Sequence, residues 1–202
     1  MDAAHFVYGA FLGVLWCLKR LFVKTPSGRQ RLNVLAALNA VTKQIVSVAN
    51  TTYVTSETVC TLLGKLAAEH VGIPITVVLD NARYQRCFMV QEVAKALHIE
   101  LLFLPSYSPN LNLIERFWKF VKKQCLYGKY YADHRAFEQA ILKCIAESST
   151  EHKAKLETLL TLNFQTFEGV PLVQDQEQKV QQPDASISLN AEAEQEVLSM
   201  AA

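Results

Sequence analysis

The sequence contains few of the residues that interrupt helices and strands or cross-link a chain. Only 7 glycines and 6 prolines occur among 202 residues, which excludes collagen-like and low-complexity chains. The five cysteines stand far apart and none forms a CxxC pair, so neither a zinc site nor a disulfide framework is predicted. No apolar run approaches the ~20 residues that a membrane-spanning helix needs. We therefore expect a soluble, cytoplasmic globular protein without a membrane partner.

Acidic residues are almost missing from the first 56 positions, where Asp2 stands alone. They gather at the other end instead. Residues 171–202 carry six acidic residues and one basic residue, a net charge of −5, whereas residues 1–170 carry +6. After Gly169 the apolar periodicity stops and Gln, Glu, Ser and Ala dominate. We expect one basic folded domain over 1–169 and an acidic, disordered tail over 170–202.

Hydrophobic patterning within the folded part predicts both strands and helices. Apolar runs at 31–40 and 44–49, joined by a short polar link, predict a hairpin, and 21–24 predicts a further short strand. Two β-branched runs, at 73–79 and 99–104, predict buried strands. Helical patterns are expected from Ser56 as N-cap onward and at 87–97, 113–127, 135–147 and 152–162. Alternating strands and helices imply parallel pairing and the hairpin implies antiparallel pairing, so the expected fold is a mixed α/β sheet flanked by helices.

Three carboxylates stand where ligands commonly bind. Asp80 follows the strand at 73–79, and open α/β sheets bind ligands at the carboxyl ends of strands; the alternative is an aspartate that caps the next turn. Glu115 lies in the first turn of a helix, where the alternative is a capping box with Asn112. Two such carboxylates would hold a hard divalent cation such as Mg²⁺. Asp2, if a strand ends there as well, would add a third carboxylate and permit two ions.

Four motifs carry a resemblance to the catalytic core of bacterial insertion-sequence transposases of the mariner-like superfamily. They are MDAAHF, ITVVLDNARYQRC, IELLFLPSYSPNLNLIERFWKFVKK and TLNFQTF. The resemblance spans residues 1–168, and the 34 residues between Asp80 and Glu115 match a spacing common in that superfamily.

The resemblance implies a ribonuclease-H-like fold and a DNA transposase that cuts and joins strands. It implies that Asp2, Asp80 and Glu115 form a catalytic triad that binds two Mg²⁺ (or Mn²⁺) ions. We expect Asn81, next to Asp80, to support either the metal site or the backbone. The implied partners are transposon-end and target DNA, together with a second copy of the chain in a homodimer.

Basic residues follow both later carboxylates. Arg116, Lys119 and Lys123 fall on one side of a helix, at i, i+3 and i+7. The alternative is a solvated helix face, but a nuclease needs phosphate contacts beside its metals. The expected DNA-binding set is Arg83, Arg86, Arg116, Lys119, Lys122 and Lys123. For Trp118 a core position is expected, and for His5 a structural one.

The start of the chain departs from the superfamily pattern. Only Met1 precedes Asp2, where family members have most of a strand and, before it, a helix-turn-helix region. We therefore expect a truncated first strand and a truncated or split-frame product. The alternative function is a catalytically inactive remnant that keeps DNA or partner binding.

Overall fold

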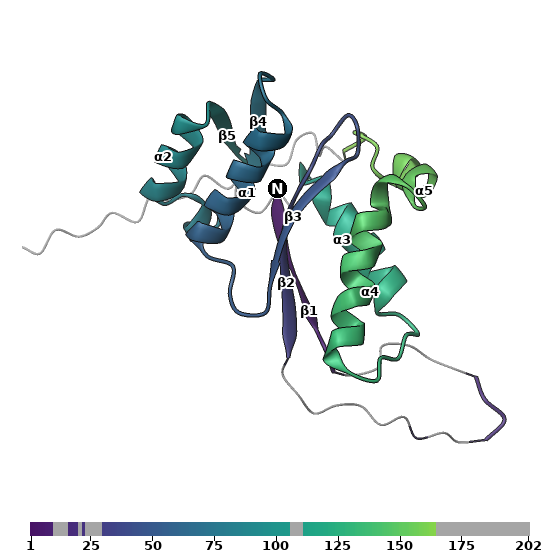
Figure 1. Ribbon diagram of the computed structural model, residues 1–202. Coiled ribbons are helices and arrows are strands. Elements are labelled where there is room, and N and C mark those ends of the chain that lie inside the picture. Colours follow the sequence, from purple (N-terminus) through teal and green to yellow (C-terminus); the bar gives the residue numbers. More distant parts are fainter. Residues whose placement is uncertain (10–15, 20–21, 23–29, 106–110, 165–202) are drawn as a thin grey trace, which may run out of the picture. The chain divides into compact units, whose positions relative to one another are not determined.

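The computed structural model describes residues 1–9, 16–19, 22, 30–105 and 111–164, all within a unit that runs from Met1 to Thr166. An antiparallel sheet has the order β1-β2-β3, and a second pair of strands is parallel (Figure 1). The strands are β1 (Asp2–Val7), β2 (Arg31–Leu38), β3 (Ile45–Asn50), β4 (Ile75–Leu79) and β5 (Ile99–Phe103). The Met1 amino group donates a hydrogen bond of 2.7 Å to the Val78 carbonyl, which links the first sheet to β4.

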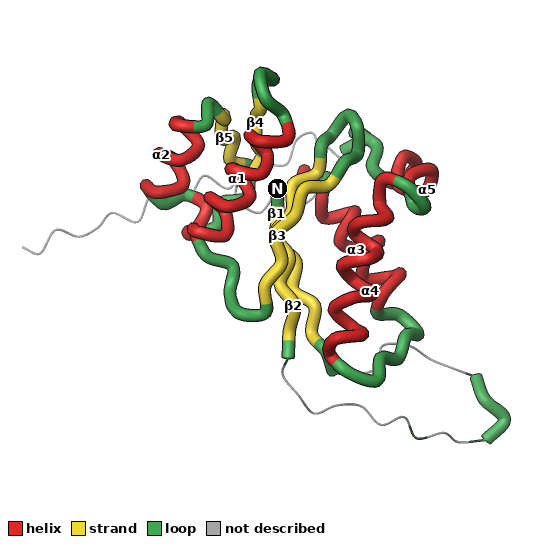
Figure 2. The backbone as a smooth tube through the Cα atoms, viewed as in Figure 1, coloured by secondary structure: helices red, strands yellow, loops and turns green. Residues whose placement is uncertain are grey.

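The helices lie on both sides of the antiparallel sheet (Figure 2). They are α1 (Ser56–Glu69), α2 (Phe88–Ala96), α3 (Ile114–Cys125), α4 (His134–Ala146) and α5 (Lys153–Leu159), with short 3₁₀ turns η1 (Arg83–Gln85) and η3 (Glu147–Ser149). None of the helices in the described part is long and apolar enough to cross a membrane.

The predicted mixed α/β fold is confirmed, with the hairpin, the parallel pair and all five helices within a few residues of their expected bounds. Two expectations are wrong in detail. Thr55, not Ser56, is the N-cap of α1, and its backbone N–H donates to Thr58 Oγ1 at 3.2 Å. A strand begins at Asp2 instead of ending there: Asp2–Val7 pairs with β2, and its later residues alternate in burial. The predicted strand at 21–24 lies almost wholly outside the described residues, as does the tail at 170–202.

Alternation along β1 and β2 sends side chains into two separate cores. Ala4 and Phe6 of β1 face Leu32 and Val34 of β2 on the side covered by α3, α4 and α5, which we call the α3 core. Residues of the other parity face α1, α2, β4 and β5, which we call the α1 core; Leu35 is one of them. The antiparallel sheet is thus the middle layer of three. β1 belongs to this layer and therefore lies between the α3 core and the α1 core.

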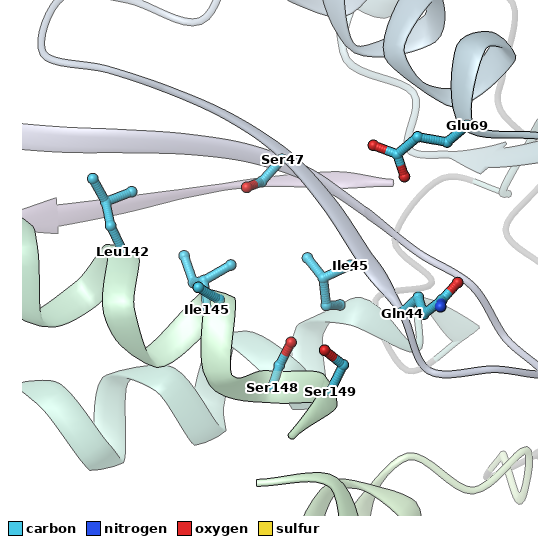
Figure 3. Close-up of a pocket in the computed structure, with 9 residues that line it drawn as sticks. Gln44, Ile45, Ser47, Glu69, Leu142, Ile145, Ser148 and Ser149 are labelled. Carbon is cyan, nitrogen blue, oxygen red and sulfur yellow. The ribbon is translucent and has the colours of Figure 1, made fainter. Parts of the chain in front are cut away.

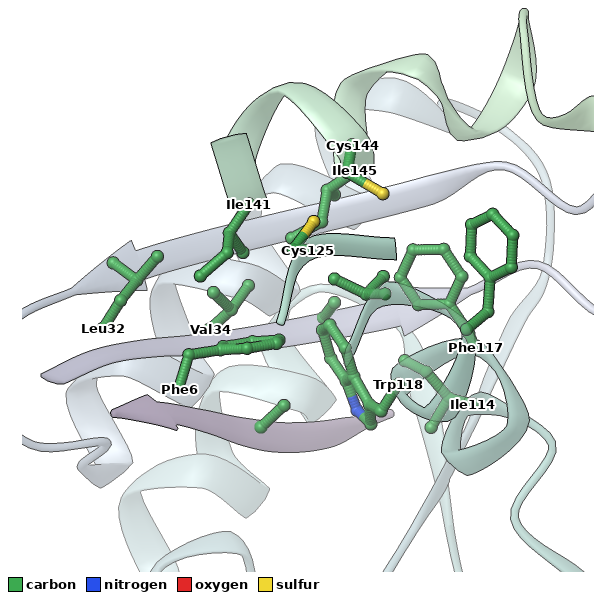
Figure 4. Close-up of a cluster of buried hydrophobic side chains, with 14 of the residues drawn as sticks. Phe6, Leu32, Val34, Ile114, Phe117, Trp118, Cys125, Ile141, Cys144 and Ile145 are labelled. Atoms are coloured by element: carbon green, nitrogen blue, oxygen red, sulfur yellow. The ribbon is translucent and has the colours of Figure 1, made fainter. Parts of the chain in front are cut away.

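Helix α3 has the sharpest division between apolar and charged faces. Phe117 and Val121 are fully buried in the α3 core, whereas Lys119 and Lys123 are exposed. Figure 4 shows Trp118 inside this cluster, with its ring edge toward Phe6 at a centroid distance of 6.1 Å, so the expected core position is confirmed. This burial fixes the rotation of α3 and therefore the direction of the residues in its first turn.

Replacing Phe117 by Ala should reduce the free energy of unfolding by about 3–5 kcal/mol, because a fully buried ring leaves a cavity in the α3 core. Urea unfolding measures the loss. The matched control is Phe88→Ala, at a side chain that is 77% exposed and should change stability by no more than ~0.5 kcal/mol. Equal losses at the two sites would contradict the described core.

Candidate active site

Asp80 follows β4 directly, at the carboxyl end of the parallel pair. The apolar strand before it is anchored in the α1 core, where Leu79 is fully buried. The Asp80 carboxylate is half-buried, and its Oδ1 accepts a hydrogen bond of 3.0 Å from Asn112 Nδ2. A side chain just ahead of α3 therefore holds the carboxylate at the end of β4.

Asp2 is the first residue of β1, and its Oδ1 accepts a hydrogen bond of 2.7 Å from the backbone N–H of Ala3. Burial raises the pKa of Asp2 to about 6, and the charges of Asp80 and Glu115 act in the same direction. The Ala3 N–H lowers this pKa but does not offset burial. Asp2 therefore lies within electrostatic reach of both other carboxylates, in a place that disfavours its charge.

Glu115 lies in the first turn of α3, with its backbone N–H bonded to the Asn112 carbonyl at 3.2 Å. Burial raises the pKa of Glu115, and the charge of Asp80 adds to this, whereas Lys119 and Lys122 lower it. The capping-box alternative does not describe this helix start. Leu113 is the N-cap and makes no side-chain cap hydrogen bond, and Asn112 Nδ2 donates to Asp80.

The three carboxylates come from separate elements and influence one another, yet they are not drawn tightly together. Among the residues that the structure describes, no group of three Asp, Glu, His or Cys side chains is close enough to hold a metal ion as it stands. Burial is the main reason that the pKa values of Asp2 and Glu115 are raised, and the charge of Asp80 adds to it in both cases.

Two further residues interact with these carboxylates and were not predicted to. Asn112 was considered only as a cap, although it stands three residues before Glu115 in the motif. Tyr84, in η1, is partly buried; burial raises its pKa, and so do the charges of Asp2 and Asp80. Asn81 donates from Nδ2 to the Leu104 carbonyl at 2.7 Å, which ties the loop after β4 to the end of β5.

The basic residues divide into two groups. Arg116 donates to the carbonyls of Thr161 and Asn163 at 2.8 and 2.7 Å, so its guanidinium joins α3 to the segment after α5. Most of the other basic residues are exposed to solvent. These are Arg83, Arg86, Lys119 and Lys123, whereas Lys122 is half-buried. His5, expected to be structural, is exposed and its Nδ1 lies 2.7 Å from Asn33 Oδ1.

A separate cavity of about 320 Å³ lies between β3 and the end of α4 (Figure 3). Its lining includes Ser47, Glu69 and Ser148 and contains none of the predicted site residues. One carboxylate without a neighbouring acid or base gives this cavity no recognisable chemistry.

The DDE superfamily endonuclease family matches residues 19–138, more than half of the chain, and the chain belongs to that family. No curated protein matches the sequence.

Solved structures share the fold at low identity. A simian T-cell lymphotropic virus intasome, in complex with PP2A regulatory subunit B56 gamma, matches with a TM-score of 0.54 and 18% identity over 74% of this chain and 47% of that chain. The Mos1 mariner paired-end complex with Mn matches with a TM-score of 0.53 and 10% identity over 83% and 55%. The Mos1 transposase paired-end complex with left transposon end gives 0.51 and 9% over 80% and 55%. The chain thus spans about half the length of these structures. The structural similarity confirms the predicted ribonuclease-H-like fold, which integrase and transposase cores share.

Asp2→Asn should stabilise the metal-free protein at neutral pH. The folded state raises the Asp2 pKa from 3.8 to about 6, so the stability that Asp2 contributes is present below pH ~4 and is lost as pH rises through 6. Asparagine cannot ionise, so the variant should gain on the order of 1 kcal/mol over the wild type at neutral pH. Urea unfolding in EDTA measures the difference, which should vanish in acid.

The control for this comparison is Glu151→Gln, at an exposed carboxylate, which should change stability by no more than ~0.5 kcal/mol at neutral pH. A constant stability difference between Asp2→Asn and the wild type across the pH range would contradict the placement of Asp2.

Proposed function

We propose that this chain is the catalytic domain of a DNA transposase that cleaves and joins strands by two-metal phosphoryl transfer. One observation carries the proposal: Asp80 is held by Asn112 at the end of β4 and interacts electrostatically with both Asp2 of β1 and Glu115 of α3. Three carboxylates from three elements, none paired with a neutralising arginine, form a site whose charge a cation would balance.

The donor set fits magnesium or manganese. Carboxylate oxygens are the ligands that these hard cations prefer, and the pKa values of Asp2 and Glu115 are raised partly by the other acidic residues. Asp2, Asp80 and Glu115 would hold two ions. Bound there, the ions would activate water or a DNA 3′-hydroxyl and stabilise the leaving oxygen of an in-line displacement.

The chain's own residues orient the site and offer a path for DNA. Asn112 donates to Oδ1 of Asp80, so Oδ2 would bind a cation. Asn81 ties the loop after β4 to the end of β5. Lys119 and Lys123, exposed on α3, follow Glu115 along the helix and would contact phosphates. Arg83, Arg86 and Lys122 would extend that contact. Arg116 has a structural role in holding the segment after α5.

DNA and a second copy of the chain are the proposed partners. Two of the structural neighbours are described as paired-end complexes, one of them with a left transposon end. A synaptic homodimer on two transposon ends is the assembly that these neighbours suggest for this chain.

Purified full chain should nick supercoiled plasmid DNA in Mn²⁺ or Mg²⁺ and not in EDTA. Glu115→Gln should reduce the nicking rate by at least a hundredfold, because it removes one metal ligand while keeping the shape of the side chain. Gel electrophoresis of the plasmid measures nicking, and thermal unfolding checks that the variant folds.

The matched control is Glu57→Gln, in the first turn of α1 and away from the three carboxylates, which should leave nicking unchanged. A wild-type chain that binds DNA but does not cut it in either metal would favour the alternative of an inactive DNA-binding remnant. Cleavage that survives Glu115→Gln would contradict the assigned triad.

Asn112→Ala should weaken metal-dependent nicking about 10–100-fold, as expected for a residue that orients a metal ligand. The structural reason is the loss of the 3.0 Å hydrogen bond to Asp80. The half-saturating Mn²⁺ concentration should rise in parallel, whereas a purely structural role would lower thermal stability without changing metal dependence. Asn112→Asp, which keeps the size but loses the donor, should be at least as impaired.

A further inference from the structure

The Arg116 side chain joins the first turn of α3 to the segment after α5. Its guanidinium donates two hydrogen bonds, to the Thr161 carbonyl at 2.8 Å and to the Asn163 carbonyl at 2.7 Å. Its Cζ atom also lies 5.5 Å from the ring centroid of Phe164. Two charge-assisted hydrogen bonds and a cation–π contact therefore hold this side chain in one place, directly after Glu115 in the sequence.

The segment that Arg116 binds, residues 161–164, is anchored on both sides. Before it, Leu160 is fully buried in the α3 core, and its N–H donates to the Leu156 carbonyl at 2.8 Å. At its other end, Phe164 packs against the same core. Because both ends are held, the segment provides Arg116 with a fixed point of attachment.

The first turn of α3 is held only weakly by its own backbone. The N-cap residue, Leu113, makes no side-chain cap hydrogen bond. The backbone N–H groups of Glu115 and Arg116 bond to the carbonyls three residues before them, both at 3.2 Å. Hydrogen bonds over three residues have poorer geometry than those of a regular α-helix, and helix ends fray. Side-chain contacts are therefore needed to fix this turn.

Contacts on two sides of the helix determine the direction of Glu115. Ile114 and Phe117 are buried in the α3 core (Figure 4), and Arg116 is bound to residues 161–164. Successive residues of an α-helix are rotated by about 100° around its axis. With the positions before and after it both fixed, Glu115 is left facing the other two carboxylates, and the loss of either contact would free the turn that carries it.

We propose that Arg116 is a positioning residue for Glu115. By binding residues 161–164 to the first turn of α3, it fixes the backbone that carries the Glu115 carboxylate and so raises the affinity of the site for a divalent cation. This inference rests on the proposed function, because it takes Glu115 as a metal ligand. It makes the segment after α5 a structural support of the site, to which that segment contributes two backbone carbonyls and no carboxylate.

Arg116→Lys in the full chain tests the proposal, because lysine keeps the positive charge but lacks the planar fork that bonds to two carbonyls at once. In the metal-free variant, amide hydrogen exchange measured by NMR should become about tenfold faster at Glu115, and should not change at Ile141 in the middle of α4. The dissociation constant for Mn²⁺, measured from the electron paramagnetic resonance signal of the free ion, should rise about tenfold. DNA affinity should change by less than about twofold, because the net charge is the same.

The matched control is Arg135→Lys, at an exposed arginine in the first turn of α4, which should change neither the exchange rate of Glu115 nor the Mn²⁺ dissociation constant. Thermal unfolding of each variant sets a working temperature at which all of them are folded. A lower unfolding temperature of Arg116→Lys with an unchanged Mn²⁺ dissociation constant would mean that Arg116 only stabilises the fold, and would overturn the proposal.

Glu115→Gln in the same Mn²⁺ titration separates this inference from the proposed function. If Glu115→Gln weakens Mn²⁺ binding and Arg116→Lys does not, the positioning role is wrong and the three-carboxylate site stands. If Glu115→Gln leaves Mn²⁺ binding unchanged, the assigned triad is wrong, and the inference fails with it. A loss of DNA affinity in Arg116→Lys without a change in Mn²⁺ binding would also overturn the proposal, because Arg116 would then act on DNA rather than on Glu115.

Discussion

The hydrogen bond between Asn112 and Asp80 is the contact on which the arrangement of the site depends. It joins the carboxyl end of β4, which belongs to the α1 core, to the start of α3, which belongs to the α3 core. The antiparallel sheet separates those two cores, and Asp2 begins the strand between them. This polar contact of 3.0 Å thus links the two cores beside Asp80.

The site is costly for the unliganded chain. Asp2 and Glu115 are partly buried and their charges oppose that of Asp80, which is why both have raised pKa values. Lys119 and Lys122 act against this at Glu115, and the Ala3 N–H and the Met1 amino group act against it at Asp2. Ordinary surface carboxylates avoid such a cost, and its concentration at one point of the fold is typical of a functional site. A divalent cation would be coordinated by these carboxylates and would offset their repulsion. The carboxylates that destabilise the metal-free protein would therefore be the ones that bind the metal.

Sequence patterns predicted the elements well because the periodicity of each is local. The hairpin, the strand before Asp80 and the amphipathic α3 all follow from residues close together in the chain, as did Trp118 in the core. Contacts over long separations were not visible. Asn112 reaches Asp80 across 32 positions, and Arg116 reaches carbonyls 45 and 47 positions away, so both were assigned other roles. The place of β1 in the sheet was not visible either, because it follows from pairing with β2, between residues far apart in the chain.

The central claim is that one cation site is shared by β1, β4 and α3. Titrating ¹⁵N-labelled protein with substoichiometric Mn²⁺ tests it most directly, because the paramagnetic ion broadens only the amide signals near it. The account predicts that Ala3, Asn81 and Glu115 lose intensity together at the same Mn²⁺ concentration, and that Asp80→Asn prevents the loss at all three. Broadening at only one of these amides, or broadening that Asp80→Asn leaves unchanged, would contradict it.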